Sequence, residues 1–270
     1  MRIALTIAGS DSGGGAGIQA DLKTFQRFGV FGTSVVTAIT AQNTVGVRAV
    51  HPVPVNIIED QLAALAEDLP PAAFKTGMLG SADVVRAVAA AIARYRWGPY
   101  VLDPVMAAST GARLLDQDAE TEVRNRLLPL STVVTPNLEE TAALVNSPIR
   151  GADAMERAGH ALVEMGAGAA LIKGGHLAGD SLVDVLVTRD EVRRFEHPRI
   201  ATRSTHGTGC TLSAAITAGL ARRLEGRTTE KSLPWDLLTS TVADALEYVQ
   251  RAIAAAPGVG AGTGPLNHSA

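Results

Sequence analysis

The chain of 270 residues is long enough for one large α/β domain or two small ones, and 46% of its residues are hydrophobic while only 4% are aromatic. Its net charge of −3 and dispersed basic residues argue against a nucleic-acid-binding surface, and no apolar run approaches the roughly 20 residues of a membrane span. A single cysteine, Cys210, excludes an internal disulfide and fits a reducing compartment. We therefore expect a cytoplasmic protein without nucleic-acid or membrane partners.

Short apolar runs alternate with segments of helical period through the first half of the chain. Gly29 is a typical helix stop, and Ser81 is a typical N-cap before apolar residues at helical spacing. The elements expected here are a strand at 2–9, a helix at 17–29, a strand at 33–44, a helix at 56–69, a strand at 72–79, a helix at 81–95 and a strand at 99–106.

The alternation continues in the second half and includes one hairpin. The connection between the runs 182–190 and 191–200 is too short for a crossover, so these strands should be antiparallel. The other elements expected are a helix at 116–128, a strand at 131–137, helices near 137–145 and 151–165, a strand at 167–176, and helices at 208–223 and 235–254.

Strands that alternate with helices of this length predict an α/β fold with a central, mostly parallel sheet and helices on both faces. No stretch resembles a linker, so residues 1–270 are expected to form a single domain. In such sheets ligands bind beyond the carboxyl ends of the strands. The residues that follow each strand are therefore the candidates for a functional site.

The loop after the first strand, "AGSDSGGGAG" at 8–17, looks like a phosphate-binding loop but matches neither common template. It lacks the third glycine of the dinucleotide fingerprint. Gly9 and Gly14 have the spacing of a Walker loop, but Gly15 and Ala16 follow where Lys and Thr are required.

Two carboxylates follow predicted strands. Asp103 ends a strand before a proline, and Glu140 lies three residues after Asn137 at a helix start. Together they can hold Mg²⁺, largely through water. The alternatives are an Asx turn for Asp103 and a first-turn glutamate that faces the helix dipole for Glu140.

A second glycine cluster, "HGTGC" at 206–210, directly precedes a helix of small residues. Successive N–H groups at a helix start bind anions, and a thiol there has a lowered pKa, so Cys210 is a candidate base or nucleophile. A small buried side chain is the alternative for Cys210. Lys173, at the end of another strand, either reaches a phosphate or leaves the sheet into solvent.

Taken together, several motifs resemble the hydroxymethylpyrimidine/phosphomethylpyrimidine kinases of thiamine biosynthesis, members of the ribokinase-like superfamily. The motifs run in order from residue 3 to about 268: "AGSDSGGGAGIQADLKTF", "TAITAQNT", "KTGML", "DPVM", "TPNLEE", "IKGGH", "HGTGCTLSAAI" and "GPLNH". The resemblance implies a three-layer ribokinase-like fold, the substrates ATP and a small pyrimidine, Mg²⁺, and a homodimer.

The resemblance also implies roles for individual residues. The N–H groups of Gly207, Thr208, Gly209 and Cys210 would hold the transferring phosphoryl group, and Cys210 matches the family's proposed catalytic base. The remaining roles are contacts to ATP by Lys173, Thr208 and Asn137, organisation of Mg²⁺ by Asp103 and Glu140, and contacts to the pyrimidine by Gln42, Asp21, Gly9, Met78 and Val105. On this interpretation the first glycine loop forms a substrate wall.

Two other functions stay open at this stage. A pyridoxal or pyridoxine kinase of the same superfamily shares the fold and a hydroxymethyl acceptor on a planar ring, although Gln42 and Met78 favour the pyrimidine. A pyrimidine-binding module without catalytic activity is the second alternative. The presence of Asp103, Lys173 and Cys210 argues against it.

Overall fold

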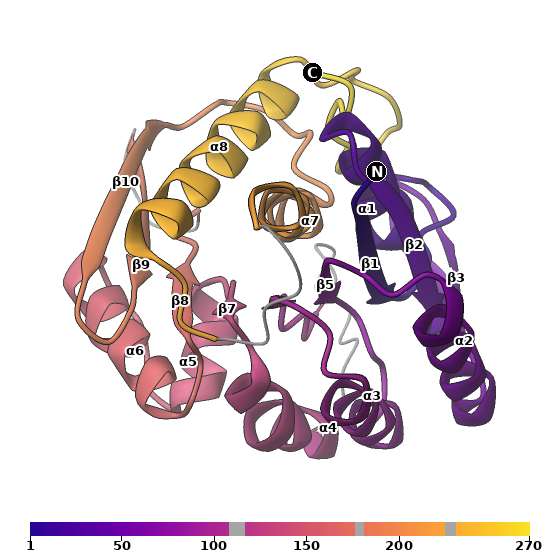
Figure 1. Ribbon diagram of the computed structural model, residues 1–270. Coiled ribbons are helices and arrows are strands. Elements are labelled where there is room, and N and C mark those ends of the chain that lie inside the picture. The colour runs from indigo at the N-terminus through magenta and orange to yellow at the C-terminus, as the bar shows by residue number, and fades with distance from the viewer. Residues whose placement is uncertain (108–116, 176–180, 225–230) are drawn as a thin grey trace.

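The computed structural model describes residues 1–107, 117–175, 181–224 and 231–270 and contains an eight-stranded sheet between two layers of helices (Figure 1). The strand order is β10-β9-β8-β7-β6-β5-β1-β2. The strands of this sheet are β1 (Ile3–Ala8), β2 (Phe31–Val36), β5 (Ala73–Thr76), β6 (Tyr100–Leu102), β7 (Val133–Val134), β8 (Ala169–Ile172), β9 (Ser181–Val187) and β10 (Val192–Pro198).

The neighbouring strands from β2 to β8 are all parallel, whereas β9 and β10 pair antiparallel. The predicted hairpin and the predicted mostly parallel sheet are therefore confirmed. The chain runs from β1 outward to β2 and then returns to the other side of β1 at β5. This reversal places a topological switch point between β1 and β5, where ligands of open α/β sheets bind.

Helices cover both faces of the sheet, as Figure 1 shows. On one face lie α1 (Gly17–Arg27), α7 (Thr208–Arg223) and α8 (Trp235–Ala254). On the other lie α2 (Val55–Asp68), α3 (Ala82–Tyr95), α4 (Gln117–Glu122), α5 (Leu138–Val145) and α6 (Ala152–Glu164). The helix predicted at 116–128 continues from α4 as a π-helical turn at Val123–Leu127 and a 3₁₀ turn at Leu128–Leu130, and its first residue lies outside the described ranges.

Local sequence explains how the two layers form. Ser81 caps α3 by accepting a hydrogen bond from the Val84 N–H, as predicted, and the apolar stripe of this helix is buried. Helix α7 is buried nearly all round because small side chains let it lie between the sheet and α8. A Cβ at Gly219 would lie 2.8 Å from the Thr241 side chain, so α7 and α8 pack too closely for a larger residue there.

The single strand predicted at 33–44 is wrong. The chain turns at Thr37, whose N–H donates to the Ala8 carbonyl (3.0 Å) and whose hydroxyl donates to the Met78 carbonyl (2.7 Å). Residues beyond the turn form β3 (Ala38–Gln42), which pairs antiparallel with β4 (Val47–Pro52) in a separate two-stranded sheet. Strand β4 was not predicted, because five of its six residues are exposed and it has no alternating apolar pattern.

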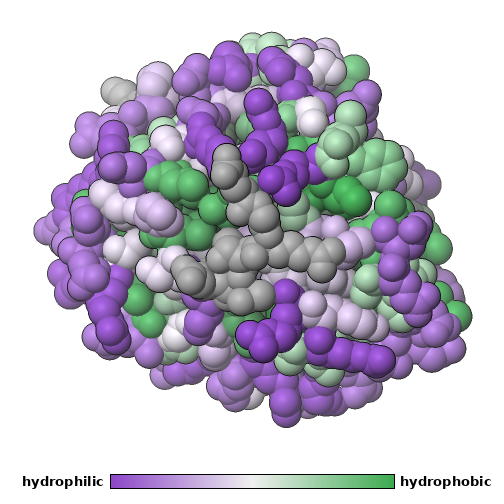
Figure 2. All heavy atoms as spheres, viewed as in Figure 1, coloured by the Kyte–Doolittle hydropathy of each residue, from purple (hydrophilic) through white to green (hydrophobic). Residues whose placement is uncertain are grey.

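Within the described residues, no helix is both long and apolar enough to cross a membrane. On the face shown in Figure 2, hydrophobic residues occur as separate groups among hydrophilic ones. The tail from residue 257 contains no helix or strand.

Candidate functional site

The second glycine cluster forms the start of α7. Gly207 is the N-cap residue, with a φ of 81°, and the Thr211 N–H donates to its carbonyl (2.8 Å). A helix leaves its first N–H groups without intrahelical acceptors, and here these groups include those of Gly209 and Cys210. The Thr208 hydroxyl donates to the Thr205 carbonyl (2.7 Å), which stabilises the turn before the helix. The start of α7 therefore offers the N–H groups of Gly209 and Cys210 where the sequence predicts anion binding, whereas the Thr208 N–H donates to the Thr205 carbonyl (3.3 Å).

Lys173 and Asp103 lie directly beside this helix start. The Lys173 Nζ is 3.3 Å from the Asp103 Oδ1. A Cβ placed on Gly209 would lie 3.1 Å from the same Nζ and 3.9 Å from both Asp103 carboxylate oxygens. Three predicted site residues thus meet at one point: Lys173 directly after β8, Asp103 directly after β6, and Gly209 in the first turn of α7, where the lack of a side chain keeps that point open.

Asp103 and Glu140 flank Lys173. Asp103 is almost completely buried and accepts hydrogen bonds from the hydroxyls of Ser213 (3.2 Å) and Thr135 (3.4 Å). The Glu140 Oε2 lies 3.9 Å from the Lys173 Nζ. Burial alone would lower the pKa of Lys173, but the two carboxylates outweigh it and raise that pKa above its ordinary value. The Lys173 side chain is therefore protonated and positively charged.

Asn137 and Glu140 also cap α5. The Asn137 Oδ1 accepts from the Glu140 N–H (2.9 Å), and the Glu140 Oε2 accepts from the Asn137 N–H (2.7 Å). This capping box is the structural role expected for a glutamate in the first turn. Burial, with a contribution from Asp103, raises the pKa of Glu140 to about 7, against the opposing charge of Lys173.

The two carboxylates fit the chemistry of a magnesium site without completing one. In the described part of the chain no group of three or more His, Cys, Asp or Glu residues can hold a metal ion. Mg²⁺ usually keeps several waters and takes one or two carboxylates together with substrate phosphates. Asp103 and Glu140 supply such a partial set beside the start of α7.

The expected low pKa of Cys210 is wrong for the free protein. The side chain is only partly exposed, and burial raises the pKa of its thiol to about 12, although the neighbouring positive charge of Lys75 opposes this. Asp21 and Asp103 raise the pKa further, and the Gly17 N–H, which donates to the sulfur, lowers it. Desolvation therefore outweighs the Lys75 charge and the Gly17 hydrogen bond.

Asp21 lies in a buried ion pair behind the site. Its carboxylate accepts from the Lys75 Nζ (2.9 Å) and from the Thr6 hydroxyl (2.6 Å), and no side-chain surface of Asp21 or Lys75 is exposed. Burial would lower the pKa of Lys75, but Asp21 raises it above its ordinary value. Asp21 can contact a substrate directly only if one of its carboxylate oxygens accepts a further hydrogen bond besides that from Lys75 or Thr6.

Two of the expected pyrimidine contacts adjoin each other at the switch point. A Cβ on Gly9 would lie 2.5 Å from the Met78 Cε, so the methionine side chain covers the glycine. Val105 follows β6 and is half-buried, and its N–H donates to the Asp103 carbonyl (2.9 Å). These residues lie in loops at the carboxyl ends of β1, β5 and β6, as the fold requires.

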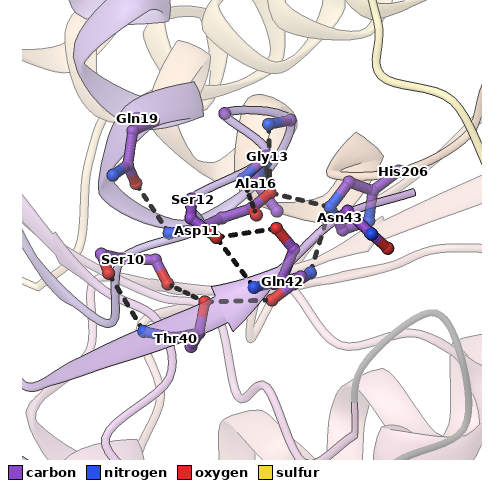
Figure 3. A network of polar contacts seen from close by, with 12 residues as sticks. Ser10, Asp11, Ser12, Gly13, Ala16, Gln19, Thr40, Gln42, Asn43 and His206 are labelled. Carbon is purple, nitrogen blue, oxygen red and sulfur yellow. Dashed lines mark hydrogen bonds and ion pairs between the residues drawn. The ribbon is translucent and has the colours of Figure 1, made fainter. Parts of the chain in front are cut away.

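Gln42 ends β3 and reaches toward the first glycine loop (Figure 3). Its side-chain Nε2 lies 3.3 Å from the His206 Nε2, and its Oε1 lies 3.4 Å from the Thr40 hydroxyl oxygen. His206 directly precedes Gly207, so the expected ring-contacting glutamine touches the residue next to the anion-binding helix start.

Asp11 organises the first glycine loop and was missed in the sequence. Its carboxylate accepts hydrogen bonds from the N–H groups of Gly13, Gly15 and Ala16 and from His206 (Figure 3). The signal was an aspartate at the head of a glycine run, where its side chain can accept N–H groups further along the chain. Its long-range partner, His206, gives no local signal.

Comparison with known proteins shows the family of this chain. The family model described as phosphomethylpyrimidine kinase matches residues 11–267. The chain belongs to this family. The hydroxymethylpyrimidine/phosphomethylpyrimidine kinase of Bacillus subtilis is 44% identical over 268 residues, which is 99% of this chain and 94% of that protein.

Solved structures confirm the ribokinase-like fold expected for this phosphomethylpyrimidine kinase family member. The phosphomethylpyrimidine kinase of Clostridium difficile is 39% identical with a TM-score of 0.80, and the match covers 94% of this chain and 100% of that one. The ADP complex of Bacillus subtilis pyridoxal kinase is 36% identical with a TM-score of 0.88, covering 100% and 98%. The same fold thus occurs in a phosphomethylpyrimidine kinase and in a pyridoxal kinase.

Proposed function

We propose that this chain is an ATP-dependent kinase of thiamine biosynthesis. It phosphorylates the hydroxymethyl group of 4-amino-5-hydroxymethyl-2-methylpyrimidine and then converts the monophosphate to the diphosphate. The observation that carries the proposal is the meeting of Gly209 at the α7 start with the Lys173–Asp103 pair. A cation, a row of N–H groups and a carboxylate are the groups that phosphoryl transfer requires.

In the transfer, the substrate hydroxyl oxygen attacks the γ-phosphorus, and the bond from that phosphorus to the bridging oxygen breaks to release ADP. The N–H groups of Gly207, Thr208, Gly209 and Cys210 hold the transferring group, and Lys173 balances its charge. Cys210 takes the hydroxyl proton, for which it must first lose its own, because burial raises the pKa of its thiol in the free protein.

Asp103 and Glu140 would hold Mg²⁺ beside the phosphates, with Asn137 positioning Glu140 through the capping box. When bound, the ion would supply charge neutralisation to the phosphate oxygens. Lys173, whose Nζ lies 3.3 Å from Asp103, keeps the two carboxylates near one another before any cation binds.

The acceptor ring would lie against the first glycine loop, where Gly9 lets the backbone approach it and Met78 and Val105 form apolar walls. The Gln42 amide offers one donor and one acceptor to the edge of an aminopyrimidine. Asp21 would act at the back of this pocket, through the Lys75 ammonium that it holds.

We further propose that the whole chain forms one domain, functions in the cytoplasm and forms a homodimer. The support for the dimer is the two-stranded sheet β3–β4, whose outward residues Ile39, Ala41 and Ala49 are exposed. Two-stranded sheets are marginal alone and gain stability when their open face is covered.

Comparing the two acceptors tests the proposed activity. The purified protein with ATP and Mg²⁺ is expected to phosphorylate the hydroxymethylpyrimidine and its monophosphate, measured as ADP release and by product mass. Phosphorylation of pyridoxal alone would make the protein a pyridoxal kinase, the candidate favoured by its structural neighbour at 36% identity. Acceptor binding without ATP consumption would make it a binding module.

A further inference from the structure

Asp11 is an ionised hydrogen-bond acceptor at the centre of the network in Figure 3. Its side chain is nearly completely buried, and its Oδ1 accepts from the Gly13 N–H (2.8 Å). Its Oδ2 accepts from the N–H groups of Gly15 (3.0 Å) and Ala16 (2.8 Å) and lies 2.9 Å from the His206 Nε2. A carboxylate that accepts several N–H bonds is stabilised in its charged form.

This charge decides which atom of the His206 ring carries a hydrogen. Burial works against ionisation, but the bonds from His206 and the loop N–H groups lower the pKa of Asp11 below its ordinary value. Two acceptors cannot face each other at 2.9 Å, so the Nε2 of His206 must donate its hydrogen to Asp11.

The hydrogen on His206 in turn decides the orientation of the Gln42 amide. If the Gln42 amide nitrogen faces the same Nε2 at 3.3 Å, two hydrogen-bond donors, the NH₂ group and the ring N–H, point at each other. Rotating the amide by half a turn places Oε1 against the His206 Nε2, so that the single hydrogen of this nitrogen bonds mainly to Asp11 and is shared with Gln42, and it places the NH₂ group against the Thr40 hydroxyl. That hydroxyl donates to the Ser10 carbonyl (2.9 Å), so it is available as an acceptor.

The main chain of Gln42 is fixed separately, by the residue next to Asp11. The Ser12 hydroxyl donates to the Gln42 carbonyl (2.7 Å) and accepts from the Gln42 N–H (2.8 Å). With the backbone held in this way, rotation of the amide about its last bond is the freedom that His206 restricts.

We propose that His206, held by Asp11, is a specificity-determining positioning residue that fixes the Gln42 amide with its oxygen toward the imidazole. The amide then presents its second N–H and its second lone pair in one fixed order. An aminopyrimidine edge carries a ring-nitrogen acceptor beside an amino donor, and it pairs with the amide only in the matching order. This inference rests on the proposed function, in which Gln42 contacts the ring.

A double-mutant cycle tests whether His206 acts through Gln42. His206→Phe removes the donor and keeps a planar ring. It is expected to raise the KM for the pyrimidine, and its calorimetric dissociation constant without ATP, roughly tenfold, the cost of a mispaired hydrogen-bonding group. In a Gln42→Ala background the same substitution should change both values less than about twofold. His206→Gln, which restores an N–H, should recover part of the loss.

The KM for ATP is the internal control, because His206 also adjoins Gly207. His160→Phe, a histidine change on α6 outside the network, is the matched variant and should leave all constants unchanged. An equal effect of His206→Phe in both backgrounds, or an equal rise in the KM for ATP, would overturn the proposal.

Failure of the proposed function can be distinguished from failure of the positioning role, because in the first case the unmodified protein does not phosphorylate the pyrimidine. If it phosphorylates pyridoxal instead, the binding cycle is run with pyridoxal. Coupling between His206 and Gln42 would then support the positioning role, and additive effects would overturn it.

Discussion

At the scale of single residues, Cys210 shows two opposed influences on one thiol. The helix start, the Gly17 N–H and Lys75 favour the thiolate, whereas burial and the nearby carboxylates favour the thiol. Burial is the larger effect, and the pKa rises to about 12. The free protein therefore carries a neutral thiol at the position where the sequence suggested an activated one.

This balance predicts a distinct pH profile. If the Cys210 thiolate takes the hydroxyl proton, kcat/KM for the pyrimidine should rise about tenfold per pH unit between about pH 7 and about pH 9. The reason is that kcat/KM reports the free enzyme, and the thiolate fraction grows tenfold per unit well below a pKa of about 12. Steady-state kinetics in buffers of constant ionic strength measure this slope.

Two variants separate the role of the base from a packing role. Cys210→Ala should fold normally, lose roughly 10²- to 10⁴-fold in rate, and lose the slope. Cys210→Asp supplies a carboxylate, whose ordinary pKa is far below that of a thiol, so the rise in its profile should end at a lower pH than in the unmodified protein. A flat profile for the unmodified protein, or near-normal turnover of Cys210→Ala, would show that Cys210 is not the base.

At the scale of elements, the first glycine loop and the start of α7 are one packed unit. A Cβ on Gly207 would lie 1.9 Å from the Gly15 carbonyl oxygen, and a Cβ on Gly15 would lie 2.7 Å from the His206 ring. The two loops come from opposite ends of the sequence and fit only without side chains. The first glycine loop and the turn before α7, proposed as the substrate wall and the anion-binding turn, therefore support each other's geometry.

Substituting alanine at two glycines of similar backbone geometry tests this packing. Gly207 and Gly29 have φ values of 81° and 70°, but a Cβ on Gly29 would have nothing within 4 Å. Gly29→Ala should cost about 1–2 kcal/mol of unfolding free energy, the strain of the left-handed conformation, and leave kinetics unchanged. Gly207→Ala should cost more than that and raise the KM for ATP. Urea unfolding and kinetics measure both, and equal effects of the two would contradict the packing argument.

The sequence predicted those elements whose signal is local. Helix α3 has a side-chain cap and regular apolar spacing, and the carboxyl-end rule brought Lys173 and Asp103 together correctly. The turn at Thr37 could not be predicted, because its partners lie at Ala8 and Met78.

The buried pairs of the site depend on strand order in the same way. Lys75 meets Asp21 only because β5 is inserted beside β1, which no local pattern indicates. The same reasoning applies to Asp11, whose partner His206 is separated from it by 195 positions.

At the scale of the whole molecule, the small sheet β3–β4 is less supported than the rest. Strand β3 alternates buried and exposed residues against the glycine loop, whereas β4 has no buried residue. Ile39 is 56% exposed on the outward side and directly opposes His51 across the pair. Because this sheet ends at Gln42, whatever covers its outer face also stabilises the position of the proposed ring contact.

A second copy of the chain is the cover that we propose, and a charge placed on the outer face tests it. Sedimentation velocity of the unmodified protein should give a dimer, and Ile39→Lys should give a folded monomer, because a buried lysine without a partner is costly. Phe31→Lys is the matched control, since Phe31 is also exposed, at 49%, but lies at the first residue of β2, whereas β3 follows the other end of that strand. It should remain a dimer. The monomeric Ile39→Lys protein should also show a higher KM for the pyrimidine than the control, because β3 loses its support. A monomer of the unmodified protein at micromolar concentration, or a dimer that survives Ile39→Lys, would place the subunit contact elsewhere or exclude it.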